Sequence, residues 1–407
     1  MTGMSTDFRM HHKILFSAGV LSFSLLFAAS SFAASQTDSE PADSGKTAAE
    51  LNGYSEERWE QLNDNTLDYD ELKDLIHTFN PSISAAWHNF NSAVSDMNTM
   101  VENLQSRQRD MKNEKETAKS AGDYSAYGNY AMQEMILKKT VSALSDAKDL
   151  MARPVTQSNR PLRQAEAQVV YGAKSLMIAY QSMEDQRQIL SELVSMDLTL
   201  SSNAASRAAA GTGTQADVLS AQADLLSAQV KLAQVTTAEG SLKKNLILMC
   251  GWKEDADPVI GEVPASDLSR IDAMNPAADM TKAIGNNYSL ISFRSGEHKK
   301  STASYQARDL TEEQMEGNLS ANLTSDYNEV LSDRTGLEAD RAGYDAAVIT
   351  KNAADTEFSL GMITQAQYQG MITSYIRAES ALKTADRTLF QALETYDAAV
   401  AGICPVE

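Results

Sequence analysis

The sequence is poor in the residues that several classes of protein need. Only two of its 407 residues are Cys and five are His, too few for a disulfide scaffold or a clustered metal site. The 20 Gly and 8 Pro are sparse for a turn-rich β protein or a disordered chain. Basic residues number 35 against 55 acidic, and the net charge of −20 argues against nucleic-acid binding. What remains is the composition of a protein built from long helices.

The first 33 residues have the pattern of a secretory signal peptide. Arg9 and Lys13 precede an apolar run over residues 14–29, and small residues at the −3 and −1 positions fit cleavage after Ala33. The run is short for a membrane span, and an uncleaved anchor is the rival interpretation. No Cys lies near the cleavage position, which argues against a lipid-anchored form. We therefore expect an exported protein.

The mature chain is expected to consist of long helices without a transmembrane span. No later stretch approaches about 18 consecutive apolar residues. Residues 34–54 are polar and predict a disordered linker. From Tyr69 on, the pattern is helical almost throughout. The predicted helices cover residues 69–78, 82–119, 129–152, 161–209, 214–249, 276–300, 304–358 and 364–402.

A duplicated turn is the strongest signal in the sequence. Residues 211–217 (Gly-Thr-Gly-Thr-Gln-Ala-Asp) end one long helix and open another. Residues 361–367 (Gly-Met-Ile-Thr-Gln-Ala-Gln) do the same 150 residues later, with Gly, Thr, Gln and Ala matching in place. Since both turns connect long helical segments, each copy predicts an antiparallel helical hairpin.

Each residue of the duplicated turn has a structural role. Gly211 and Gly361 can adopt positive φ and end a helix. Thr214 and Thr364 can cap the following helix through their hydroxyls. Architecture alone explains this capping, and a second role of the exposed tips in docking a partner is a separate hypothesis.

A seven-residue repeat follows both turns in the same phase. Its 3-4 spacing of apolar positions predicts left-handed coiled-coil packing, and alanines in one seam allow close approach of the helices. Leu219, Leu226 and Ala233 widen the stripe of the first copy enough to contact more than one neighbour. An ordinary two-stranded coiled coil is the plainer alternative, but it does not explain the duplicated turn. The two seams of the second copy are Tyr368, Tyr375, Leu382, Leu389, Tyr396 and Ile403, and Met371, Ala378, Ala385, Ala392 and Ala399.

Several further motifs stand in one order along residues 69–404. Residues 80–83 (Asn-Pro-Ser-Ile) open the first copy and residues 287–290 (Asn-Tyr-Ser-Leu) open the second, while Gly251 and Gly402 close them. Together with the duplicated turns and the alanine ladders, this order resembles the TolC-type outer-membrane efflux protein family. The resemblance rests on order and duplication, because no single motif is specific.

The resemblance implies a non-catalytic homotrimer without a cofactor, whose helices enclose a tunnel across the periplasm and whose strands form a barrel in the outer membrane. It also implies that the hairpin tips dock a periplasmic adaptor and meet an inner-membrane pump. The candidate docking residues are Gly211, Thr214, Asp217, Gly361, Thr364 and Gln367.

The sequence departs from that family in two places. Residues 113–160 read as helix, turn and helix where a strand hairpin is implied, and the second copy is 57 residues shorter before its turn than the first. We therefore expect little or no β structure, with the barrel strands shortened or lacking. The acidic residues that narrow such tunnels correspond to Gln367 and Gly370 here, so an acidic gate is not implied. Asp217 is best explained as a first-turn carboxylate favoured by the helix dipole.

No residue pattern supports catalysis or metal binding. The sequence has no phosphate-binding loop, dinucleotide fingerprint or nucleophile elbow. His77, His88 and His298 are scattered, and a structural role explains each better than metal ligation. Cys250 and Cys404 each end one copy, and a disulfide between them and two unpaired buried thiols are equal alternatives.

The sequence thus predicts an all-α fold of long antiparallel coiled-coil hairpins in two internal repeats. The expected units are a signal peptide (1–33), a linker (34–54), a first helical repeat (55–274) and a second (275–404). The leading hypothesis is a helical conduit component for efflux or export, located in the periplasm and outer membrane. The alternative is a periplasmic or cell-surface coiled-coil scaffold that kept this fold without transport activity.

Overall fold

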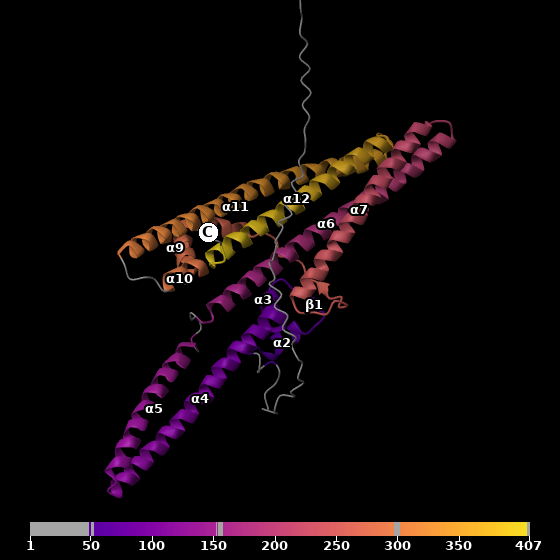
Figure 1. Cartoon of the computed structure of the whole chain (residues 1–407). Coiled ribbons are helices and arrows are strands. Elements are labelled where there is room, and N and C mark those ends of the chain that lie inside the picture. The colour runs from indigo at the N-terminus through magenta and orange to yellow at the C-terminus, as the bar shows by residue number, and fades with distance from the viewer. Residues whose placement is uncertain (1–48, 50–52, 152, 154–157, 297–301, 405–407) are drawn as a thin grey trace, which may run out of the picture.

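The computed structural model describes residues 49, 53–151, 153, 158–296 and 302–404, and within them the chain is almost entirely helical (Figure 1). The helices are α2 (Glu56–Leu62), α3 (Leu72–Phe79), α4 (Pro81–Ser120), α5 (Tyr124–Met151), α6 (Arg160–Ala209), α7 (Gln215–Met249), α8 (Leu268–Ala273), α9 (Pro276–Asn286), α10 (Tyr288–Ser295), α11 (Thr302–Ser359) and α12 (Gln365–Val400). The strands in the described part are β1 (Thr66–Leu67) and β2 (Val259–Ile260), which pair in parallel. None of the described helices combines the length and the apolarity that crossing a membrane requires.

Two predicted segments fall largely beyond this description. The expected signal peptide, 1–33, lies outside the described residues. So does the expected linker, 34–54, apart from Ala49, Gly53 and Tyr54. Ala49 is buried, and Tyr54 packs against the first hydrophobic core. The last part of the expected linker therefore contacts the folded chain.

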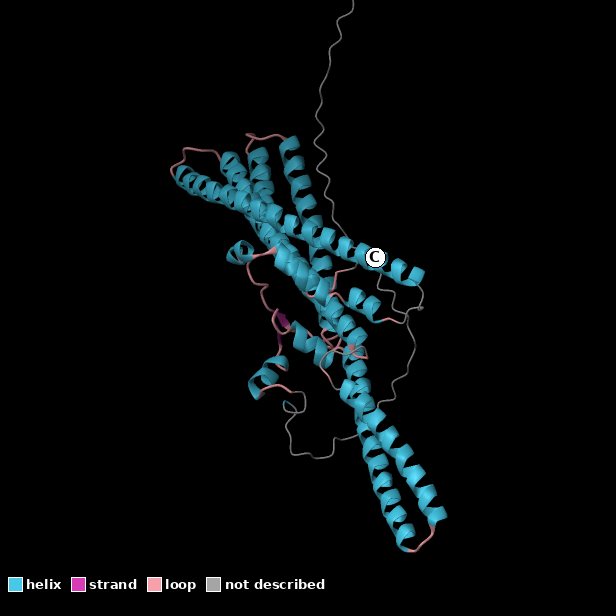
Figure 2. Cartoon of the chain, turned by 90° about the vertical axis from the view of Figure 1, so that its left-hand side faces the viewer, coloured by secondary structure: helices cyan, strands magenta, loops and turns pink. Residues whose placement is uncertain are grey.

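Three long antiparallel hairpins dominate the fold. They are α4–α5, α6–α7 and α11–α12, and α6 packs against α12 as well as against α7. The four helices of the last two hairpins therefore form one layer in the order α7, α6, α12, α11. The tips of these two hairpins point in the same direction, and the α4–α5 hairpin points the opposite way (Figures 1 and 2). The predicted all-α fold of long hairpins in two repeats is confirmed.

Two hydrophobic cores lie near the ends of the hairpins away from the tips, and each includes a residue of the other repeat, Phe390 in the first core and Ile271 in the second. The first core joins α3, the start of α4 and parts of α6 and α7, with Leu75, Met177 and Leu246 fully buried. The second joins α9, α11 and α12, with Leu323 and Leu389 fully buried. The layer toward the tips is thinner, since its helices contact only their lateral neighbours.

The motifs that open and close each repeat meet in space. Asn80 caps α4, where Pro81 takes the first position, and its Nδ2 donates to the Met249 carbonyl at 2.7 Å. Gly251 follows with φ 86°, and a Cβ there would lie 2.0 Å from the Phe79 carbonyl oxygen. The opening motif of the first repeat is therefore fastened to its closing glycine.

The second repeat repeats this junction. Asn287 caps α10, and its Nδ2 donates to the Cys404 carbonyl at 2.9 Å. Gly402 has φ 97°, and a Cβ there would lie 2.2 Å from the Asn286 carbonyl oxygen. In both repeats the closing glycine thus lies against the residue before the opening asparagine. The duplication extends from the sequence to the packing.

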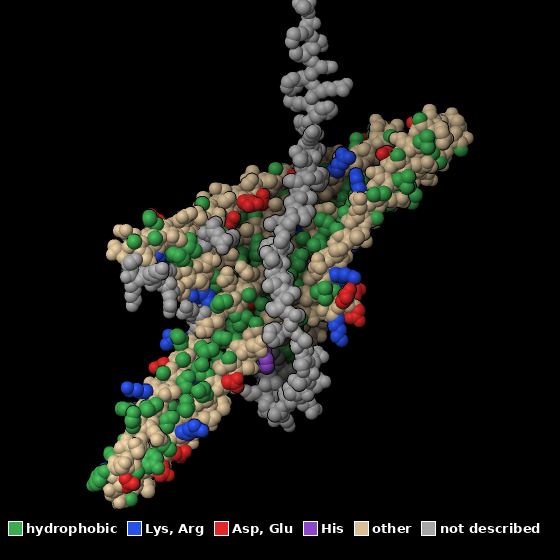
Figure 3. All heavy atoms as spheres, in the orientation of Figure 1, with side chains coloured by type: hydrophobic (Ala, Val, Ile, Leu, Met, Phe, Trp, Pro, Cys, Tyr) green, Lys and Arg blue, Asp and Glu red, His purple; other side chains and the backbone are tan. Residues whose placement is uncertain are grey.

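The length difference between the repeats corresponds to the α4–α5 hairpin. In the second repeat the short helix α10 takes the place of the first two turns of α4, and α11 corresponds to α6. The part of α4 beyond residue 90, together with α5, has no counterpart. This segment, the arm, projects from the body, and hydrophobic side chains lie along its surface (Figure 3). The predicted helix, turn and helix over 113–160 are confirmed up to Met151, and residues 152 and 154–157 of that range lie outside the described residues.

Most predicted helix boundaries lie within a few residues of the observed ones. The prediction of one helix over 276–300 is wrong, because Asn287 adopts an extended backbone (ψ 117°) and separates α9 from α10. Residues 297–301 of that prediction lie outside the described residues. The helix predicted from residue 129 begins earlier, at Tyr124. There Asp123 accepts the amides of Ser125 and Ala126 and starts the helix immediately after the turn.

Candidate functional site

The two predicted tips have the same backbone geometry. Gly211 and Gly361 have φ 70° and 71°, a conformation that side chains with a Cβ disfavour. In each tip the glycine amide donates to the carbonyl three residues earlier, and the next amide donates to the carbonyl five residues earlier, at 2.8 to 3.1 Å. This pair of bonds is the Schellman motif, which satisfies carbonyls at a helix end. Both tips are therefore rigid turns.

A capping box begins the helix after each tip. The Thr214 hydroxyl accepts the Asp217 amide at 3.2 Å, and Asp217 Oδ2 accepts the Thr214 amide at 2.9 Å. Thr364 and Gln367 make the same reciprocal pair at 3.3 and 2.9 Å. The bond from the Thr214 backbone lowers the pKa of Asp217. All six predicted tip residues thus build the turns, and Asp217 acts as a first-turn carboxylate, in line with its expected role.

The second tip exposes two apolar side chains that the sequence pattern did not single out. Leu360 and Met362 flank Gly361 and are 68% and 70% exposed. The equivalent residues of the first tip are Ala210 and Thr212. A signal was present, since large apolar residues on both sides of a turn glycine have no core to enter. The two tips therefore differ chemically although their backbones agree.

Aromatic packing stiffens the second tip from below. Phe358 and Tyr368 stack face to face with ring centroids 4.5 Å apart. The Tyr368 hydroxyl donates to Asp355 Oδ1 at 2.8 Å, and Lys351 pairs with the same carboxylate at 2.8 Å. Leu360 and Met362 accordingly project from a base that these contacts hold in place.

The first hairpin contains a buried acidic residue that the sequence patterns did not single out. Asp197 of α6 is only 9% exposed, and the exposed Asp224 of α7 lies close enough for its charge to act on it. Burial, and secondly the charge of Asp224, raise the pKa of Asp197. The equivalent positions of the second hairpin are the uncharged Ala347 and Ser374. The first hairpin is therefore weakened at neutral pH at a point where the second is not.

The two cysteines lie in different surroundings. Cys250 is fully buried in the first core, and burial raises the pKa of its thiol to about 12. Cys404 packs against the second core, where its sulfur accepts Asn322 Nδ2 at 3.6 Å. No disulfide joins them in the described structure.

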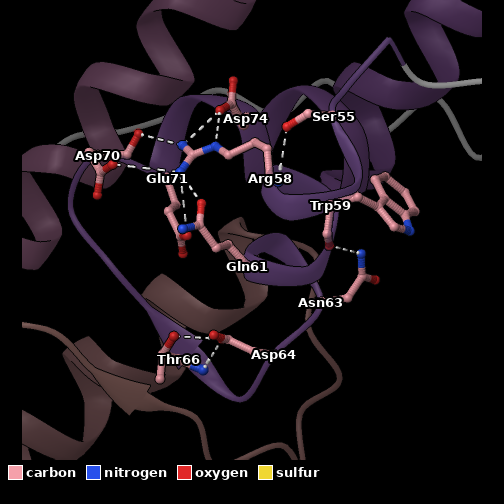
Figure 4. Close-up of polar contacts among 10 residues, drawn as sticks. All are labelled: Ser55, Arg58, Trp59, Gln61, Asn63, Asp64, Thr66, Asp70, Glu71 and Asp74. Carbon is pink, nitrogen blue, oxygen red and sulfur yellow. Dashed lines mark hydrogen bonds and ion pairs between the residues drawn. The ribbon is translucent and has the colours of Figure 1, made fainter. Parts of the chain in front are cut away.

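Polar contacts at the base of the first repeat have a structural role. Arg58 of α2 bonds Asp74 of α3 through Nε and Nη2 at 3.0 and 2.8 Å and lies 3.5 Å from the buried Glu71 (Figure 4). His77 meets Glu166 of α6 at 2.8 Å, and this bond raises the pKa of the imidazole. These contacts fasten α2 and α3 to the body. Among the described residues no three His, Cys, Asp or Glu side chains gather as they would around a metal ion.

Comparisons with known proteins give a likeness in fold. No protein-family model and no curated protein sequence matches the chain. The solved outer-membrane channel OprN has a TM-score of 0.47 and 11% identity, over 84% of this chain and 92% of that one. A membrane protein from Pseudomonas aeruginosa has 0.47 and 12%, over 82% and 93%. The CmeC outer membrane channel of Campylobacter jejuni has 0.40 and 11%, over 66% and 68%.

Proposed function

We propose that this chain is a non-catalytic component of an efflux or export conduit in the periplasm and outer membrane. Copies of the chain join edge to edge into a closed ring of helical hairpins, and the tips dock a periplasmic adaptor that leads to an inner-membrane pump. The observation that supports the proposal best is the contact between α6 and α12. The helices at the two open edges of the layer, α7 and α11, are the counterparts of α12 and α6 in the other repeat. Each edge therefore presents one half of the same kind of contact.

The contact between α6 and α12 joins the two repeats. Lys174 pairs with Glu394 at 2.8 Å, and Asp185 lies 3.4 Å from Arg387. Toward the tips Thr373 contacts the sulfur of Met196 at 3.8 Å. The face of α12 that meets α6 thus extends over many turns. Thr373, Ser380, Lys383 and Arg387 lie on this face, and the buried Gln369 and Ile376 continue the same side of α12 in heptad spacing.

The equivalent face of α7 is exposed and apolar. The α7 residues that lie 150 positions before Gln369, Ile376 and Ser380 are Leu219, Leu226 and Val230. These three side chains are 59%, 61% and 57% exposed. Exposed apolar residues in heptad spacing are typical of a helix that has a further partner. They include two of the residues that widen the first copy's stripe in the sequence.

The equivalent face of α11 is lined by small residues. The α6 residues in contact with α12 correspond to small, exposed residues on α11. No described helix covers these α11 residues. Large residues on α7 and small ones on α11 complement each other as knobs and holes. The positions are Ser332, Thr335, Gly336, Ala339, Gly343 and Ala346.

These two edges predict a ring. Because α7 and α11 are different surfaces on opposite edges of one layer, their contact is head to tail, and such contacts close into a ring when the rotation allows. First and second repeats would then alternate around the ring, and every pair of neighbouring repeats would meet through the same kind of contact. The family resemblance implies three copies. Both tips of every copy would lie at the same end, where Leu360 and Met362 offer an adaptor an apolar anchor.

Transport is tested with the purified protein and lipid vesicles that contain a small fluorescent solute. The proposal expects association of the protein with the vesicles and release of the solute. A ring that leaves the vesicles intact would contradict transport and support the scaffold alternative. The double variant Leu360→Ser with Met362→Ser separates docking from release, since it is expected to abolish export in cells and to leave release from vesicles unchanged.

A further inference from the structure

We propose that the arm is a self-association site, at which α5 of one chain pairs antiparallel with α5 of a second copy. The contact uses residues outside the layer and does not depend on the proposed ring. Its basis is a second heptad seam on α5, distinct from the seam that faces α4.

The inner seam of the arm is already occupied. Val94, Val101 and Leu104 of α4 face Leu137 and Val141 of α5, and all are buried or half-buried. Lys115 and Glu134 form an ion pair within the same seam. The arm is thus a complete two-stranded coiled coil before any other helix is added.

A second seam runs along the outer side of α5. Ile136, Thr140, Ala143, Ala147 and Leu150 follow one another at intervals of four, three, four and three residues. Ile136 and Leu150 are 52% and 50% exposed, Thr140 and Ala143 are exposed, and Ala147 is half-buried. The Thr140 hydroxyl donates to the Ile136 carbonyl at 3.0 Å, so it needs no further hydrogen-bond partner. The seam is about 21 Å long and has no partner among the described residues.

The seam is complementary to itself when reversed. With Ala143 opposite Ala143 of a second copy, Ile136 lies opposite Leu150 and Thr140 lies near Ala147. Large residues thus meet at both ends and small residues meet at the centre, where the helices can approach closely. A two-fold axis through Ala143 gives this pairing, and such symmetry is the commonest in homodimers.

The flanking charges favour the antiparallel direction. Lys139 and Asp146 lie seven residues apart on the same flank of the seam, and neither forms an ion pair within the described part of the chain. In an antiparallel pair the same flanks of both helices meet, so Lys139 faces Asp146 of the second copy. In a parallel pair that flank would meet Leu137 and Leu144, which have no charge to offer. The arrangement therefore identifies a second arm as the occupant.

A lipid surface suits the arm less well. A helix that binds a membrane surface usually has a face rich in Lys and Arg. The charged residues near this seam have both signs, with Lys138, Lys139 and Lys148 beside Asp146 and Asp149.

Single-cysteine variants test the pairing in the Cys404→Ser background, where Cys250 is buried. Ala143→Cys is expected to form a disulfide-linked dimer on oxidation, and Ile136→Cys alone is not. A mixture of Ile136→Cys and Leu150→Cys is expected to form a mixed dimer. Ser142→Cys, exposed on another side of the same helix, is the matched control. A dimer of Ile136→Cys alone, or no dimer above the control, would overturn the proposal.

Charge reversal tests the same contact without cysteines. Lys139→Asp places like charges opposite each other and is expected to weaken arm dimerisation about tenfold, which corresponds to about 1.4 kcal/mol. The double variant Lys139→Asp with Asp146→Lys is expected to restore it. Equal dimerisation of all three proteins, or binding of the arm to vesicles in place of dimerisation, would contradict the inference. None of these outcomes depends on ring formation through α7 and α11.

Discussion

At the scale of single residues, the contact between each closing glycine and the opening motif of its repeat holds the hairpin to its core. Gly251 lies against Phe79 and Gly402 against Asn286, at distances that leave no room for a Cβ. Both glycines also have positive φ. The same contact in both repeats indicates that it fixes how each hairpin is anchored to its core.

Gly251→Ala and Gly402→Ala are each expected to lower the free energy of unfolding by roughly 2–4 kcal/mol, because strain in φ adds to the clash. Urea denaturation measures the loss. Gly240→Ala is the control, since that glycine is helical and a Cβ there would meet nothing within 4 Å. Ala is the better helix former there, so this change is expected to add about 0.5–1 kcal/mol. Equal midpoints for Gly251→Ala and Gly240→Ala would contradict the junction.

Asp197 gives a pH dependence at the same scale. Its pKa in the folded chain is raised by burial and by Asp224, so the folded state binds a proton more readily than the unfolded state. The free energy of unfolding therefore falls as pH rises from the unfolded pKa through the folded pKa, and it stays lower at neutral pH. The weakening is confined to α6–α7, since Ala347 occupies the equivalent place in the second hairpin.

Asp197→Asn is expected to raise Tm by about 2 °C at pH 7. The variant is expected to lose this advantage over the wild type below about pH 4, where Asp197 becomes protonated in the folded and the unfolded state and is then as uncharged as Asn. Thermal unfolding followed by circular dichroism at both pH values checks it. Asp149→Asn, at a side chain that is 65% exposed, is expected to change Tm at neither pH. A decrease in Tm at pH 7 would show that Asp197 is stabilised by a partner.

At the scale of elements, the tips and the arm differ in how well the sequence predicted them. The tips follow from local chemistry, because a glycine in the left-handed region and a Thr three residues later specify a helix end and a helix start. The helices of the arm were also expected. Its direction was not, since the orientation of α4–α5 relative to the tips depends on packing around the start of α4. Ile83 and Trp87 pack in the first core there, while residues beyond Phe90 belong to neither core.

The capping boxes predict local stability at the tips. Thr364→Ala removes both hydrogen bonds of the Thr364 hydroxyl, one from the Gln367 amide and one to the Gln367 side chain, and is expected to cost about 1 kcal/mol. Hydrogen exchange of the Gln367 and Tyr368 amides would then become faster, while amides near Leu389 would be unaffected. Thr364→Ser keeps the hydroxyl and is expected to behave as the wild type. Unchanged exchange in Thr364→Ala would show that the Schellman turn alone holds the tip.

The arm is expected to be dispensable for the fold of the layer. Replacing residues 89–159 by residues 296–309, which stand between the corresponding positions of the second repeat, would make the first repeat resemble the second. This variant is expected to remain folded with cooperative unfolding, because no residue between Phe90 and Met151 belongs to either core. Circular dichroism and thermal unfolding measure the outcome. A molten variant would mean that the arm contributes to the folding of the first repeat.

At the scale of the whole molecule, the sequence predicted the two hairpins but not the order of their helices. The seven-residue repeats identify which face of each helix is apolar, and they indicate that α7 has a wider stripe than a hairpin needs. They do not say which neighbour occupies it. The structure places α12 beside α6, through ion pairs such as that of Lys174 with Glu394, and so leaves the stripe of α7 open. The candidate interface between copies could be defined only once this order was known.

In the proposed ring, α7 of one copy packs on α11 of the next copy in the way that α12 packs on α6. Ser380 and Ile189 line one shallow pocket between α12 and α6, and their equivalents are Val230 and Ala339. The most direct measurement is oxidation of the double variant Val230→Cys with Ala339→Cys in the Cys404→Ser background. Gln229→Cys with Ala339→Cys is the control. The account predicts a covalent ladder that ends at a closed trimer for the double variant, and a monomer for each single variant. A double variant that stays monomeric at concentrations where the wild type is oligomeric would contradict it.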